Sequence, residues 1–105
     1  MERRGFSVNF FDVTFPENGE RFDTLFAKED LRIVRIASGE VDGVQEFCQE
    51  DDEWVIVCEG EAWLEIAGAK KELKKGDFCY IPAHTPHKLL RVQPGTLWLA
   101  VHFKR

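Results

Sequence analysis

The fold is decided by a glycine turn that leads into a short apolar run and then into two prolines, in the stretch Gly76-Asp77-Phe78-Cys79-Tyr80-Ile81-Pro82-Ala83-His84-Thr85-Pro86-His87. A short run rich in aromatic and β-branched residues, bounded by turn residues, is typical of a β-strand. Pro82 and Pro86 bracket His84, so His84 is predicted to lie in a loop. His87 opens the next apolar run and shares a face with Leu89, because side chains alternate along a strand.

The rest of the chain continues this pattern of short apolar runs separated by glycine and proline. It predicts an all-β fold, a single antiparallel β-barrel or jelly roll. Residues Phe6–Val13 could form an edge strand or an arm, and the spacing of Phe22, Leu25 and Phe26 predicts a single helical turn. Gly60 is predicted to supply a positive-φ turn between the two strands of a hairpin. The candidate strands are Leu31–Ile36, Trp54–Val57, Ala62–Ala67, Phe78–Ile81, His87–Val92 and Leu97–Phe103.

Length and composition predict one domain over residues 1–105, with an N-terminal arm, edge strand and turn over 1–30 and the barrel over 31–103. A chain of 105 residues can bury one hydrophobic core, and 44% hydrophobic residues are enough to form it. The net charge of −5 argues against nucleic acid and against an anionic membrane surface as partners. We expect neither a transmembrane segment nor a signal peptide.

The three cysteines indicate a reducing compartment. An odd number without a CxxC pair argues against a disulfide framework and against a zinc knuckle, so we predict free thiols and a cytoplasmic location. Cys48 and Cys79 are predicted to be buried small hydrophobic residues.

A metal site could be built around Gln49 and Glu53. On an unbroken strand these side chains would share a face but lie about 13 Å apart, too far to bind one ion. A bend at Glu50-Asp51-Asp52 could bring them together. The alternative is a solvated acidic turn. His84 and His87 leave a similar choice, since a histidine beside an apolar face is more often a hydrogen-bonded core residue than a ligand.

Two spacings in these segments resemble the cupin family. Glu53 is followed by six residues and then Gly60, as in the second half of the first cupin motif. Gly76, five residues, Pro82 and then His87 match the second motif, and 15 residues separate the two motifs. The resemblance covers Leu31 to Phe103 and implies a small single-domain cupin, of a subgroup in which glutamine replaces a motif-one histidine.

The resemblance implies a divalent transition metal, iron, manganese, nickel or zinc, with an incomplete ligand set. Glu53 matches the family's glutamate ligand, His87 its motif-two histidine, and Gln49 takes the place of the second histidine. The first histidine has no equivalent. His84, which stands at a glycine position of the second motif, could replace it, and the case for His102 is weaker. Either histidine could instead act as a catalytic acid or base.

The resemblance implies two classes of function. The first is a metal-dependent enzyme acting on a small polar molecule, a dioxygenase, isomerase or decarboxylase-like activity. The second is a non-catalytic module that binds or senses a sugar-like or other small ligand without a functional metal, in which Glu53 and His87 would form a hydrogen-bonded pair. A homodimer is also expected, because the N-terminal stretch carries apolar surface at Phe6, Phe10, Phe11 and Phe15.

Overall fold

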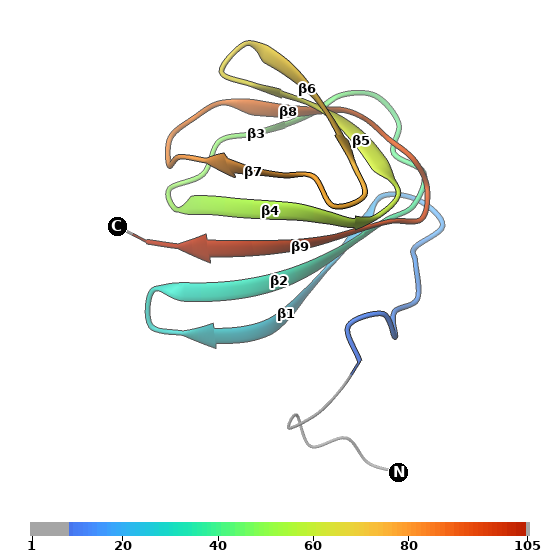
Figure 1. Cartoon of the computed structure of the whole chain (residues 1–105), viewed down its shortest axis with the longest axis horizontal. Helices are drawn as coiled ribbons and strands as arrows, with labels where there is room; N and C mark the ends of the chain where they lie inside the picture. Colours follow the sequence, from blue (N-terminus) through green and yellow to red (C-terminus); the bar gives the residue numbers. More distant parts are fainter. Residues whose placement is uncertain (1–8, 105) are drawn as a thin grey trace.

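The computed structural model describes residues 9–104, which form two antiparallel β-sheets that face each other (Figure 1). This confirms the predicted all-β jelly roll. No helix occurs among residues 9–104, and thus none that could cross a membrane. The strands are β1 (Glu20–Lys28), β2 (Leu31–Ser38), β3 (Gln45–Phe47), β4 (Asp52–Glu59), β5 (Glu61–Ile66), β6 (Ala69–Lys74), β7 (Phe78–Ile81), β8 (His87–Val92) and β9 (Thr96–Phe103).

Strands that are distant in the sequence are neighbours in both sheets. One sheet has the order β1-β2-β9-β4-β7 and the other has the order β3-β8-β5-β6. The C-terminal strand β9 therefore lies between β2 and β4, where Glu53 pairs with His102. This crossover positions the polar groups of the site described below.

The N-terminal predictions are only partly correct. The predicted helical turn at Phe22–Phe26 is wrong, because these residues belong to β1, which pairs with β2 along its whole length. The pairing shifts register between Thr24 and Phe26, so Leu25 has no partner on β2. Of the predicted edge strand or arm, residues 9–13 form no strand, and Phe6 to Val8 lie outside the described residues.

Gly60 makes the turn between β4 and β5 with a φ of 87°, as predicted. The predicted hairpin is wrong, because β4 and β5 belong to different sheets and do not pair with each other. A Cβ at this position would lie 2.3 Å from the Thr96 hydroxyl oxygen. Glycine is therefore needed for its backbone conformation and for the close approach of the start of β9.

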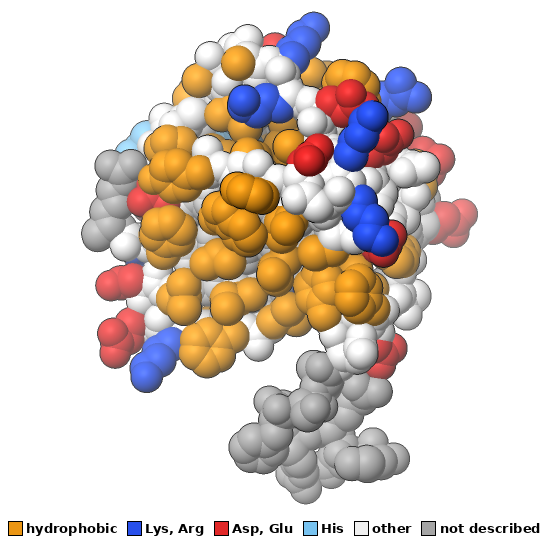
Figure 2. Space-filling model, viewed as in Figure 1, with side chains coloured by type: hydrophobic (Ala, Val, Ile, Leu, Met, Phe, Trp, Pro, Cys, Tyr) orange, Lys and Arg blue, Asp and Glu red, His pale blue; other side chains and the backbone are white. Residues whose placement is uncertain are grey.

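In the five-stranded sheet the side chains alternate between a buried inner face and an apolar outer face. The inner faces of the two sheets enclose a core that includes Val55, Val57, Leu64, Leu89 and Trp98. The outer face of the five-stranded sheet is also hydrophobic, and Figure 2 shows this surface from outside. One row across it, set by the strand register, consists of Phe26, Ile33, Val101, Trp54 and Tyr80.

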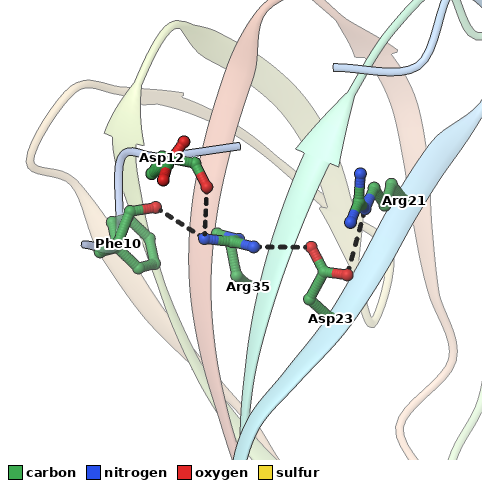
Figure 3. Close-up of polar contacts among 5 residues, drawn as sticks. All are labelled: Phe10, Asp12, Arg21, Asp23 and Arg35. Atoms are coloured by element: carbon green, nitrogen blue, oxygen red, sulfur yellow. Dashed lines mark hydrogen bonds and ion pairs between the residues drawn. The ribbon is translucent and has the colours of Figure 1, made fainter. Parts of the chain in front are cut away.

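Arg35 holds the N-terminal segment against this outer face (Figure 3). One guanidinium nitrogen donates to the carbonyl oxygens of Phe10 and Asp12, at 3.0 and 3.4 Å. The other donates to Asp23 at 2.9 Å, and this bond keeps the pKa of the Asp23 carboxyl below its usual value. The segment at Phe10–Asp12 is thus an arm fixed by hydrogen bonds to an arginine of β2.

Candidate functional site

A cavity of about 100 Å³ lies between the two sheets. Its wall is mostly apolar, with side chains such as Val55, Leu64, Ile81, Leu89 and Trp98. The polar groups that line it are Glu20, Gln49, Glu53, His87 and His102. Four of the five residues assigned to the site from the sequence therefore line one cavity: Gln49, Glu53, His87 and His102.

Glu53 and His102 form the centre of the polar cluster. They are cross-strand partners on β4 and β9, and both are buried. Nε2 of His102 lies 3.9 Å from Oε2 of Glu53, and Nδ1 lies 3.4 Å from Oδ1 of Asp51. The His102 ring is thus held between two carboxylates.

Gln49 approaches Glu53 because the chain bends at Glu50 and Asp51, between β3 and β4. The Gln49 amide nitrogen donates to Oε1 of Glu53 at 2.8 Å. The backbone carbonyl oxygen of Gln49 accepts the backbone N–H of His84 at 2.7 Å. Asp52 binds the same loop, since its Oδ1 accepts the backbone N–H of Ala83 at 2.8 Å. These contacts hold the loop before β8 against the polar cluster.

His87 is fixed in one orientation. Its Nδ1 donates to the carbonyl oxygen of Thr85 at 2.9 Å, so in the neutral ring Nε2 carries no proton and can accept a hydrogen bond. Its ring stacks on Phe47 with a centroid distance of 5.6 Å. Among the described residues no hydrogen bond joins His87 to Glu53, the pair expected for a cavity without metal. Glu53 is bonded to Gln49 instead.

His84 lies outside this cavity. It is exposed and does not belong to the lining. Its φ of 60° is the left-handed conformation that favours glycine, which fits its place at a glycine position of the second cupin motif. The loop thus keeps the backbone that the motif requires while carrying an exposed imidazole that does not line the cavity.

The donors present do not make a preformed metal centre. In residues 9–104, no group of three or more His, Cys, Asp or Glu side chains could hold a metal ion. Gln49 also directs its amide N–H toward Glu53, whereas a metal would need its oxygen. The arrangement therefore does not fit the metal that the resemblance implies.

The cysteines offer no nucleophile to this site. Burial, with the charge of Glu53, raises the pKa of the Cys79 thiol to about 11, so it stays protonated near neutral pH. Cys79 packs against the core, in line with its predicted burial, but the prediction for Cys48 is wrong. Cys48 is exposed, because it belongs to the connection between β3 and β4 rather than to a strand.

The sequence pointed to neither Glu20 nor Asp51 as part of the cluster. Asp51 belongs to the acidic run, and only the pairing of β4 with β9 brings it to His102. Glu20 pairs with Ser38, which pairs with Thr96, so Glu20 lies toward the opposite end of β9 from His102. No spacing in the sequence links Glu20 to the two motifs.

The comparisons agree with this architecture. A family model described as a cupin domain matches residues 32–101. A Ralstonia eutropha JMP134 protein, provisionally assigned as a mannose-6-phosphate isomerase, is 33% identical, with 94% of this chain and 98% of that chain covered and a TM-score of 0.81. KdgF from Halomonas sp. is 25% identical, with coverages of 83% and 80% and a TM-score of 0.71. A Streptococcus pyogenes protein of unknown function, 22% identical with coverages of 99% and 91% and a TM-score of 0.75, shares the fold. No curated protein matches the chain.

Proposed function

The chain belongs to the cupin family, and from this premise we propose that its cavity binds a small polyhydroxy compound that carries no negative charge. The observation that supports this best is the cluster of Gln49, Glu53, His87 and His102 on the wall of a largely apolar cavity. A few converging polar groups in an apolar pocket are typical of small-molecule sites. Hydroxyl groups match this cluster, because they donate to a carboxylate and to an imidazole nitrogen and accept from an amide.

The lining disfavours a phosphorylated ligand. Among the described residues that line the cavity there is no lysine or arginine, whereas Glu20 and Glu53 are both carboxylic acids. Phosphate groups are usually held by arginine, lysine or backbone N–H groups. The substrate in the provisional name of the Ralstonia protein is therefore not carried over to this chain.

Isomerisation by proton transfer is the reaction class that these residues support. A carboxylate can remove the proton from the carbon next to a carbonyl group and return it to the former carbonyl carbon, while a neighbouring imidazole carries the proton of the adjacent hydroxyl group to the carbonyl oxygen. Glu53 and His102 provide this pair, and Asp51 orients the imidazole. The protein would then convert an unphosphorylated aldose or ketose, and a non-catalytic sugar-binding cupin is the alternative.

Binding and turnover can be measured separately. Thermal shift with a panel of aldoses, ketoses, polyols and their phosphates tests binding, and NMR in heavy water tests proton exchange at the substrate carbon. We expect a stabilising shift with at least one neutral sugar and none with its phosphate. Glu53→Gln should abolish both signals, while Glu29→Gln, in the exposed turn between β1 and β2, should change neither. Binding without exchange would support the non-catalytic module.

The metal content of the protein tests the hypothesis that the site holds a divalent transition metal. The metal content of the untagged protein is determined by mass spectrometry after incubation with iron, manganese, nickel or zinc. We expect less than a stoichiometric amount. A stoichiometric metal that is lost in both Glu53→Ala and His87→Ala would overturn the metal-free site and make Gln49, Glu53 and His87 its ligands.

A further inference from the structure

The cavity adjoins an outer groove of about 400 Å³ at the start of β1. Three residues, Glu20, Phe22 and Phe47, line both the cavity and the groove. Phe22 and Phe47 are exposed although they are large and apolar. Exposed aromatic residues on both sides of an opening are expected where a ligand passes from solvent into an apolar interior. This geometry makes the groove an entrance to the barrel.

A second groove adjoins the cavity on the side of β3 and β8, but two rings stand between them. Phe47 and His87 line both spaces, and their rings stack 5.6 Å apart with an angle of 21°. His87 is also held by its bond to Thr85. The second groove is therefore closed by a fixed pair of side chains.

The carboxyl group of Glu20 has a fixed position in this entrance. The Ser38 hydroxyl donates to Oε2 of Glu20 at 2.6 Å, and the indole N–H of Trp98 donates to the Ser38 oxygen at 3.0 Å. Ser38 and Trp98 are both buried, so the chain of bonds is rigid. Oε1 of Glu20 has no partner among the described residues, which leaves it available to a passing molecule.

We propose that Glu20 is the residue that selects the charge of molecules entering the cavity, admitting neutral and cationic ones and excluding anions. Two further acids, Glu40 and Asp42, line the groove, and no lysine or arginine does so within the described chain. A fixed carboxylate between apolar walls concentrates the local field, because little water screens it. The inference deepens the proposed function, on which its biological meaning rests, by giving a reason why phosphorylated compounds would be rejected before they reach Glu53.

Collisional quenching of Trp98 fluorescence tests the proposal without any knowledge of the ligand. The measurement uses the variant W54F/W63F, in which Trp98 is the only tryptophan. The probes are iodide, caesium ion and acrylamide, which are anionic, cationic and neutral. We expect caesium ion and acrylamide to quench Trp98 more than iodide does. Glu20→Gln should raise the iodide constant about threefold and leave the acrylamide constant unchanged.

Two further variants distinguish a local effect of Glu20 from a change in the net charge of the protein. Glu29→Gln removes the same charge in the turn that follows the far end of β1 and should leave iodide quenching as it was. Phe22→Ala should raise quenching by acrylamide, because it widens the entrance. Equal quenching by iodide and caesium ion, an unchanged iodide constant in Glu20→Gln, or no response to Phe22→Ala would each overturn the proposal. Where Glu20→Gln does not fold by circular dichroism, Glu20→Ser provides the neutral variant.

The two proposals can fail independently. Charge-selective quenching without any thermal shift from sugars would leave the entrance intact and overturn the proposed ligand. A thermal shift with a neutral sugar, together with equal access of iodide and caesium ion, would keep the proposed function and overturn the role of Glu20.

Discussion

The imidazole ring of His102, on β9, lies between two carboxyl groups. Its Nδ1 is 3.4 Å from Oδ1 of Asp51, in the turn before β4, and its Nε2 is 3.9 Å from Oε2 of Glu53, on β4. Nothing in the spacing of residues 51 and 102 relates them. They meet because β9 crosses the sheet to lie beside β4. This contact identifies His102, and not His84, as the histidine beside Glu53, a choice that the sequence left open.

We expect His102 and His84 to differ sharply in ligand binding. His102→Phe keeps a ring in the cavity but removes both nitrogens, so it should abolish the thermal shift produced by a binding sugar. His84→Asn should leave that shift unchanged, because asparagine also tolerates a positive φ and this side chain lies outside the cavity. Calorimetric titration of both variants checks the prediction, and a binding defect in His84→Asn would contradict it.

Gly60→Ala should destabilise the fold by about 3 kcal/mol, which combines the cost of a positive φ with overpacking. The added Cβ would meet the Thr96 side chain at 2.3 Å. Gly76 is the matched control, because its φ of 90° is similar but its Cβ would have no heavy atom within 4 Å. Gly76→Ala should cost only about 1 kcal/mol. Urea denaturation of both variants gives the two values, and equal losses would mean that the contact with Thr96 is not limiting.

Glu20 should make the protein less stable as the pH rises above 4.5. Burial raises the pKa of its carboxyl from the ordinary value of 4.5, and the bond from Ser38 only partly opposes this. At low pH the group is protonated in both states, whereas above 4.5 the unfolded chain loses the proton first. Stability is therefore lost between 4.5 and the higher pKa of the native state. Melting temperatures of the wild type and Glu20→Gln from pH 4 to 7 should diverge in favour of the variant.

Arg35→Gln should release the N-terminal arm and change how the stability of the protein depends on pH in the acidic range. Arg35 holds Phe10 and Asp12 and lowers the pKa of Asp23. A lowered carboxyl pKa stabilises the native state above the unfolded value of 3.8, and this contribution disappears as the pH falls through the native pKa. The variant should thus melt earlier at pH 7 and differ less from the wild type at pH 2. Limited proteolysis should cut the arm faster in the variant.

The outer face of the five-stranded sheet should mediate self-association. Exposed apolar faces of this size are uncommon on monomers, and Phe78 and Tyr80 are 62% and 49% exposed. We expect a homodimer in analytical ultracentrifugation and a monomer for the double variant F78K/Y80K. A third variant, V44K, places a lysine at an exposed position outside the strands and should remain dimeric. A monomeric wild type would contradict this expectation.

The sequence by itself determined the fold class, the family and most of the strands. Turn residues at short intervals and β-branched or aromatic runs between them are local signals, and the two motif spacings are local as well. The structure confirms them because each strand and each turn is formed by consecutive residues, whose strand propensity and turn chemistry act locally. Where the local spacing misled, at Phe22–Phe26, pairing with β2 and a register shift overrode it.

The tertiary structure alone decided which side chains share the cavity. It placed His102 and Asp51 beside Glu53, brought Glu20 to the entrance and left His84 outside, since these relationships depend on the order of strands in the sheet and on loop backbone conformation. The same contacts turned the Gln49 amide toward Glu53, which a residue pattern cannot specify. Sequence patterns record which chemical groups are present, whereas pairing between distant strands sets the distances at which those groups act.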